Sequence, residues 1–166
     1  MGWVAQTLLG NQAITEVTQT KERAYKGCGS LKAKVDLIPG DPNKNDGETL
    51  VDLIKNPPSG VITPVNMAGK TITCRIWAPK GALGSGARNF IQVFVKDSKF
   101  IGYYGPDRDI QEEKWFEVSV TIPSEKVATT GFDPTDIVLV GVKIGARVGA
   151  TGSFNGFIYI DVYDWK

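Results

Sequence analysis

Two short segments, 72–77 and 91–96, carry the side chains whose types point to the most specific chemistry. Their polar and aromatic members occupy alternate positions and are Arg75, Trp77, Gln92, Phe94 and Lys96. Aromatic rings cover the apolar C–H face of a sugar ring, and amide, guanidinium and ammonium groups hydrogen-bond to its hydroxyls. This combination favours sugar binding. The alternative is that Trp77 and Phe94 pack under a neighbouring loop, because most aromatic residues in sheets serve packing.

The segment from Lys70 to Asp97 predicts two β-strands joined by a glycine-rich loop. The apolar residues of the two strands fall on every second position and are Ile72, Cys74, Ile76, Ile91, Val93 and Val95. Successive side chains of a strand point to opposite faces. We therefore expect the two strands to form a pair, with one face in a core and the aromatic and polar residues together on the other.

Length and composition limit the class of protein. The chain has 166 residues, 42% hydrophobic and 22% charged, and its net charge is +1. These values predict one globular domain over residues 1–166, with no basic surface for nucleic acid and no membrane partner. A monomer is the expected state.

Histidine is absent and there are two cysteines, Cys28 and Cys74. The lack of histidine excludes serine–histidine and cysteine–histidine nucleophile systems and any zinc site that needs histidine. Two cysteines do not make a disulfide framework. We expect two free buried thiols, with one bridge between them as the alternative.

Short strands separated by turn signals run through the whole chain. The further expected strands are 3–9 and 13–19, joined by a hairpin turn at Gly10-Asn11, and 30–37, 50–54, 114–122, 137–144 and 154–165. Residues 39–48 are dense in turn formers and are expected to be a surface loop. No segment shows a sustained helical period. Many strands linked by long loops predict an all-β fold, a two-sheet β-sandwich of jelly-roll type.

Several short motifs, in their order along the chain, carry a family resemblance. They are Gly2-Trp3, Tyr25-Lys26-Gly27 with Ser30-Leu31, Gly69 to Ile72, Val93 to Asp97, Lys114 to Val118, and Phe154-Asn155-Gly156 with Ile158 to Val162. The chain resembles the jelly-roll carbohydrate-binding modules of the galactose-binding-like clan, which accompany bacterial glycoside hydrolases. The resemblance covers nearly the whole chain.

The resemblance implies non-catalytic binding of plant cell-wall polysaccharide: β-mannan, β-glucan or xylan. It places the site in a groove on the concave face of one sheet, floored by the five residues above. Tyr103 and Tyr104 would lie at its rim, and Trp115 is a further candidate ligand. It also implies a covalently linked catalytic domain in the parent protein, and a location outside a bacterial cell or on its surface.

The resemblance further implies a structural calcium ion. The positions that match the family's ligands are Gly27, through its carbonyl, and Asp161 in the last strand. The glutamate that precedes the Gly-Trp pair in the family is absent here. Two positions do not supply the six to eight oxygens that calcium takes. The alternative is that Asp161 is an outward-facing polar residue.

Two other functions compete with sugar binding. A glycosidase needs two carboxylates across one cleft, and the strands assigned to the groove offer only Glu117 and Asp97. A protein-interaction or cell-surface adhesion domain could use the same aromatic face as a contact surface. Changes in tryptophan fluorescence on adding oligosaccharides would separate the last alternative from sugar binding.

Overall fold

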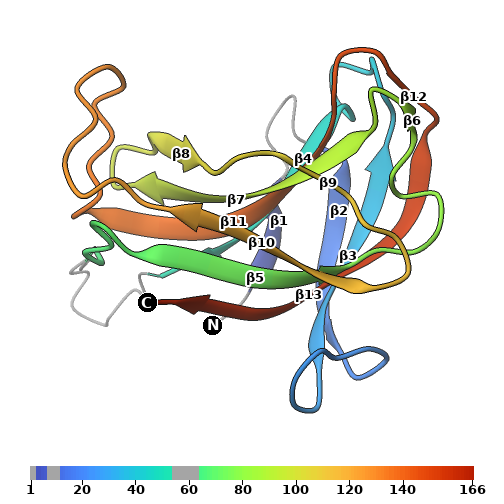
Figure 1. The fold of residues 1–166 in the computed structure, drawn as a ribbon, viewed down its shortest axis with the longest axis horizontal. Coiled ribbons are helices and arrows are strands. Elements are labelled where there is room, and N and C mark those ends of the chain that lie inside the picture. The colour runs from blue at the N-terminus through green and yellow to red at the C-terminus, as the bar shows by residue number, and fades with distance from the viewer. Residues whose placement is uncertain (1–2, 7–11, 54–63) are drawn as a thin grey trace.

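The computed structural model describes residues 3–6, 12–53 and 64–166, and within these ranges it contains β-strands and no helix (Figure 1). Sheet A contains, in spatial order, β1 (Trp3–Gln6), β4 (Asp46–Asp52), β11 (Ile137–Ala146), β7 (Asn89–Asp97) and β8 (Gly102–Tyr104), with β9 (Arg108–Asp109) also paired to β7. Sheet B contains β10 (Trp115–Thr121), β5 (Thr71–Trp77), β13 (Phe154–Trp165), β3 (Ser30–Leu37) and β2 (Ile14–Thr20). A short ladder joins β6 (Ser85–Gly86) to β12 (Ala150–Thr151). The described residues form no helix that could span a membrane.

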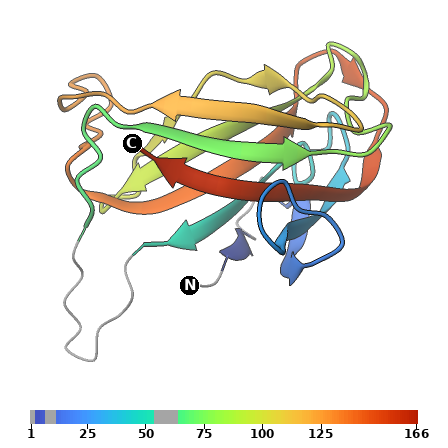
Figure 2. The same cartoon turned by 60° about the horizontal axis from the view of Figure 1, so that its bottom comes forward.

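The two sheets enclose one large hydrophobic core, and the prediction of an all-β sandwich is confirmed. Alternate residues of β5 and β7 enter this core, as the sequence pattern predicted. All the strand pairs within the sheets are antiparallel, as between β5 and its neighbours β10 and β13. Figure 2 shows these three strands side by side.

The predicted pairing of segments 72–77 and 91–96 is wrong. Both strands exist, but β5 lies in sheet B and β7 lies in sheet A. The neighbours of β7 are β11, β8 and β9. The apolar sides of β5 and β7 meet across the core, so their outer faces lie on opposite sides of the sandwich. The predicted common face therefore does not exist.

The predicted hairpin of residues 3–9 and 13–19 is also wrong. Its first strand, β1, pairs with β4 in sheet A, and its second strand, β2, pairs with β3 in sheet B. The turn at Gly10-Asn11 lies outside the described residues. Each strand has its apolar side toward the core, but the chain changes sheets between them.

The two thiols are both free, and only one of them is buried. Cys74 is 1% exposed, as its place in the alternating pattern predicted. Cys28 is exposed in the loop between β2 and β3, so the prediction of two buried thiols is wrong for this residue. That loop, residues 21–29, projects below the sandwich in Figure 1 (blue).

Candidate functional site

The structure divides the eight predicted sugar-binding residues among three places. The outer face of sheet B holds Arg75, Trp77 and Trp115, the outer face of sheet A holds Gln92, Phe94, Lys96 and Tyr104, and Tyr103 packs against the core. Tyr103 and Tyr104 are neighbours in β8, so their side chains point to opposite faces. The ring of Tyr103 stacks on buried Phe132, with centroids 5.3 Å apart. Tyr103 is therefore a packing residue and does not lie at the rim with Tyr104.

Trp77 on sheet B lies under a side chain from the 21–29 loop. The guanidinium carbon of Arg23 is 3.5 Å from the centroid of the Trp77 ring, which is the geometry of a cation–π contact. The ring also meets Tyr159 edge-on, with centroids 5.6 Å apart. A sugar stacking on this indole face would have to displace Arg23.

The second sheet B tryptophan has a similar neighbour. Tyr25 of the same loop meets Trp115 edge-on, with centroids 5.9 Å apart. Arg75 lies 4.8 Å from the Tyr25 ring and forms an ion pair of 2.8 Å with Glu117. The loop thus lies over the aromatic residues of sheet B, which is the packing arrangement that the sequence left open as an alternative.

Asp161 holds this loop in place. Its Oδ2 accepts hydrogen bonds from the backbone N–H groups of Tyr25 at 2.6 Å and Lys26 at 3.0 Å. Its Oδ1 accepts the N–H of Val162 at 2.7 Å. One carboxylate therefore connects the last strand to a loop 136 residues away.

These contacts do not fit the calcium ligand set that the resemblance implied. Calcium requires six to eight oxygens directed at one point. Here N–H donors are directed at Asp161, and Gly27 is an exposed residue of the loop with φ +76°. Among the described residues, no group of three or more histidine, cysteine, aspartate or glutamate side chains is placed to hold a metal ion. Calcium binding stays a prediction that these residues do not support.

On sheet A, the aromatic rings lie over the sheet because glycines leave room for them. A Cβ on Gly141 would approach the Phe94 ring to 2.5 Å, and one on Gly102 would approach the Tyr104 ring to 2.6 Å. The two rings stack with centroids 5.2 Å apart and an interplanar angle of 30°. Phe94 is fully buried, while Tyr104 is 38% exposed. Tyr104 is therefore the outer layer of this stack.

A buried ion pair fixes the outer ring. The Tyr104 hydroxyl donates to Glu48 Oε1 at 2.8 Å, and Lys96 Nζ lies 2.6 Å from Glu48 Oε2. Glu48 is 1% exposed and Lys96 is 8% exposed. Burial, followed by the charge of Glu48, raises the pKa of the Tyr104 hydroxyl well above its usual value. The phenol therefore stays protonated and keeps donating to Glu48. We call Phe94, Tyr104, Glu48 and Lys96 the tyrosine platform.

Polar side chains lie beside the tyrosine platform. Lys143 Nζ is 5.6 Å from the Tyr104 ring centroid and 2.9 Å from Asp46 Oδ2. Gln92, the remaining predicted ligand on this face, donates its amide to the carbonyl of Gly105 at 2.9 Å. Lys143 and Asp46 are partly exposed and can exchange hydrogen bonds with a ligand that covers Tyr104.

Sequence reasoning missed Glu48, because segment 39–48 was expected to be a loop. Strand β4 begins at Asp46, and Asp46, Glu48 and Leu50 alternate along it. That alternation was the available signal. The role of Arg23 had no such signal, because its contact with Trp77 depends on how the 21–29 loop folds back over sheet B.

Glu117 and Asp97, the two carboxylates considered for a glycosidase, lie in different sheets and do not face each other across one cleft. Glu117 lies on β10 in sheet B and Asp97 ends β7 in sheet A. Asp97 is fully buried, and its oxygens accept the N–H groups of Lys99, Ile101 and Asp133. Asp97 therefore has a structural role at the end of its strand.

Comparisons with known proteins agree with this fold. No family model and no curated protein matches the sequence. One similar solved structure concerns the promiscuous specificity of carbohydrate-binding modules from the β-sandwich superfamily; it has a TM-score of 0.62 and 21% identity over 99% of this chain, which spans 57% of that one. A Caldicellulosiruptor saccharolyticus module, CBM27-1 in complex with mannohexaose, has a TM-score of 0.60 and 12% identity over 92% of this chain and 82% of its own. The xylan-binding module CBM15 has a TM-score of 0.56 and 13% identity, covering 96% of this chain and 90% of its own. The chain has the β-sandwich fold of these carbohydrate-binding modules, as the resemblance predicted.

Proposed function

We propose that the protein binds polysaccharide without catalysis, on the outer face of sheet A, with Tyr104 as the surface on which a sugar ring stacks. The observation that carries this proposal is the tyrosine platform. Tyr104 is partly exposed, stacks at 30° on the ring beneath it and is fixed through its hydroxyl. A fixed ring loses little conformational freedom when a ligand binds, which favours affinity.

Each part of the tyrosine platform has a separate task. Tyr104 would cover the C–H face of one sugar unit, a contact on the order of 1–3 kcal/mol by analogy with base stacking. Phe94 and the Glu48–Lys96 pair support it from beneath and do not touch the sugar. Lys143 and Asp46 would hydrogen-bond to the hydroxyls at the edge of the sugar unit. The predicted direct roles of Phe94 and Lys96 thereby become supporting ones.

A few contacts of this size give weak binding. After the cost of immobilising the sugar chain, they correspond to dissociation constants on the order of micromolar to millimolar. Such affinity suits a module that keeps a linked enzyme near its substrate by raising the effective concentration. We propose β-mannan, β-glucan or xylan as ligand, a covalently linked glycoside hydrolase as partner, and an extracellular or cell-surface location in a bacterium. The fold shared with mannan- and xylan-binding modules supports this choice.

Affinity electrophoresis tests the proposal. The protein is run in gels that contain glucomannan, galactomannan, xylan, xyloglucan, mixed-linkage β-glucan or pectin. We expect one or two of the neutral polysaccharides to retard it. Tyr104→Ala should weaken the retardation, while Tyr104→Phe, which keeps the ring, should retain most of it.

Phe157→Ala is a matched control. Phe157 is 39% exposed, almost the same as Tyr104, but it lies on sheet B beside Lys32. This variant should migrate like the parent in every gel. Trp77→Ala tests the sheet B alternative in the same gels. If Trp77→Ala loses retardation and Tyr104→Ala keeps it, the sugar binds sheet B and the proposal is wrong. Absence of retardation by every polysaccharide would favour the protein-interaction alternative.

A further inference from the structure

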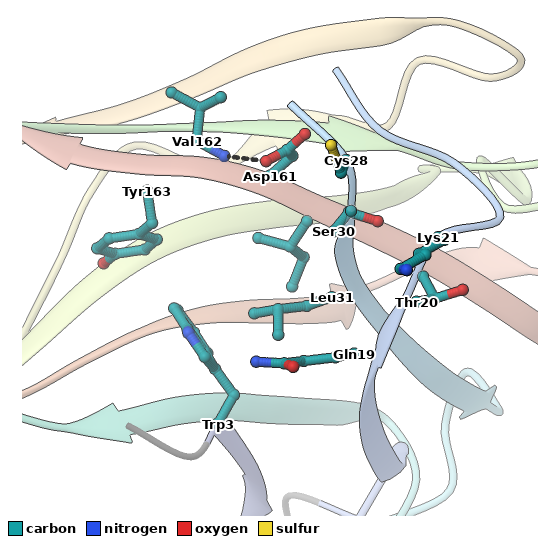
Figure 3. Close-up of a pocket in the computed structure, with 12 residues that line it drawn as sticks. Trp3, Gln19, Thr20, Lys21, Cys28, Ser30, Leu31, Asp161, Val162 and Tyr163 are labelled. Carbon is teal, nitrogen blue, oxygen red and sulfur yellow. Dashed lines mark hydrogen bonds between the residues drawn. The ribbon is translucent and has the colours of Figure 1, made fainter. Parts of the chain in front are cut away.

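A cavity of about 520 Å³ lies where the two sheets meet at one edge of the sandwich, between β1, the loop that joins β2 to β3, and the end of β13 (Figure 3). Strand β1 and strand β8, which carries Tyr104, are at opposite edges of sheet A. The cavity is therefore separate from the tyrosine platform. Its volume lies within the range of about 300–1,000 Å³ that is usual for small-ligand sites.

One side of the cavity is apolar. Trp3, Leu31 and Val162 line it, and Tyr163 meets Trp3 edge-on with centroids 5.2 Å apart. Figure 3 shows Trp3 and Tyr163 on the same side of the cavity. An aromatic ring fixed beside aliphatic side chains suits a ligand with an apolar face.

Part of the remaining lining carries hydrogen-bonding side chains. Gln19 and Lys21 make no side-chain hydrogen bond to any residue in the described ranges, although both line the cavity. Figure 3 shows the Gln19 amide close to Trp3 and Leu31. Asp161 already accepts three backbone N–H groups. An amide and a single ammonium suit a ligand with several hydroxyls better than an anion or a metal ion.

The backbone at this cavity is strained. Val162 has φ +48°, in the left-handed region that a β-branched residue rarely adopts. It lies in the irregular part of β13 where the register with β5 shifts between Asp161 and Asp164. Bulges of this kind are frequent beside binding sites, and backbone strain concentrates there. Val162 and Tyr163, which lie in this irregular part of β13, form part of the cavity wall.

We propose that this cavity is a second carbohydrate site, which takes one pyranose unit with its C–H face on Trp3 and its hydroxyls on Gln19 and Lys21. A pyranose has one apolar face and a polar edge, and the cavity has the same two-sided chemistry. The site is independent of the tyrosine platform. A chain with two sites could hold two stretches of polysaccharide at once and gain affinity through avidity.

The thiol of Cys28 reports on this cavity directly. Cys28 is exposed and lines the cavity, whereas Cys74 is 1% exposed and burial raises the pKa of its thiol. Iodoacetamide should therefore modify Cys28 alone in the folded protein. The rate of its modification is measured with and without mannohexaose, xylohexaose and cellohexaose. A sugar in the cavity should slow the reaction by about tenfold when present at ten times its dissociation constant.

Three variants make the test specific. Tyr104→Ala should keep the protection of Cys28, because that residue belongs to the other site. Gln19→Ala should weaken the protection, while Thr18→Ala, an exposed neighbour on the same strand that does not line the cavity, should leave it unchanged. The proposal is overturned if none of the three sugars protects Cys28, or if protection disappears in Tyr104→Ala. Protection of Cys28 tests the cavity, and electrophoresis of Tyr104→Ala tests the tyrosine platform. The proposal for either site can therefore fail without the other.

Discussion

The ion pair beneath Tyr104 predicts a large loss of stability when one partner is removed. Lys96→Met deletes the ammonium and keeps a chain of similar length. The Glu48 carboxylate, 1% exposed and 2.6 Å from Lys96 Nζ, then stays buried without its counter-charge. Breaking a buried pair in this way costs about 3–5 kcal/mol of unfolding free energy. Set against the total of about 5–15 kcal/mol that is usual for folded proteins, the loss is easily measured.

Urea denaturation at neutral pH, followed by tryptophan fluorescence, gives the free energy of unfolding. Lys32→Met is the matched control, because the same substitution there breaks an ion pair with Glu22. The Glu22 side chain is 56% exposed, so its carboxylate stays hydrated when Lys32 is replaced. Its midpoint should stay close to that of the parent. The double variant Glu48→Leu with Lys96→Met should recover much of the loss, since apolar replacement of a whole buried pair is often nearly neutral.

Two outcomes would show that the buried charges of Glu48 and Lys96 do not act in this way. A cost below about 1 kcal/mol for Lys96→Met would mean that the pair behaves like a surface salt bridge. A double variant less stable than Lys96→Met alone would mean that the two residues contribute through packing and not through their charges. Either result would also remove the support that we assign to the pair beneath Tyr104.

Two further predictions concern pH and calcium. Burial raises the pKa of the Tyr104 and Tyr163 hydroxyls above the usual value near 10. The folded state gains stability from the two protonated hydroxyls, and this stability is complete below about pH 10 and is lost as pH rises through the folded-state pKa values. Unfolding free energies measured by urea between about pH 8 and about pH 11 should therefore fall at the alkaline end, and should fall less in Tyr104→Phe. Adding EDTA should leave the melting temperature unchanged, because three backbone N–H groups hold the Asp161 carboxylate in place. Asp161→Ala should lower it by releasing the 21–29 loop, and a rise in melting temperature on adding calcium to the parent would contradict this account.

The sequence predicted the strands and their inner faces well. The alternation of Ile72, Cys74 and Ile76 placed all three in the core, and the apolar run at 137–144 became the central strand β11. These features are local, because the period of two along a strand depends only on the chain itself. The same pattern also indicated the class of fold.

The candidate site was predicted only in part. The sequence indicates Tyr104, but it predicts a loop at its partner Glu48 and places Tyr103 on the same rim. The contacts that decide these roles join β8 to β4, across β7 and β11. The sequence contains no signal for a hydrogen bond between residues 56 positions apart.

The alternation of apolar and polar residues specifies which side of each strand faces the core. Which strands are neighbours depends on the folded arrangement of the two sheets, and this is why Trp77 and Phe94 lie on opposite sides of the protein. In a β-sandwich both sheets direct their apolar faces inward. Two strands therefore show the same alternation whether they pair within one sheet or face each other across the core. That choice depends on how the loops carry the chain between the sheets, and a period of two contains no information about it.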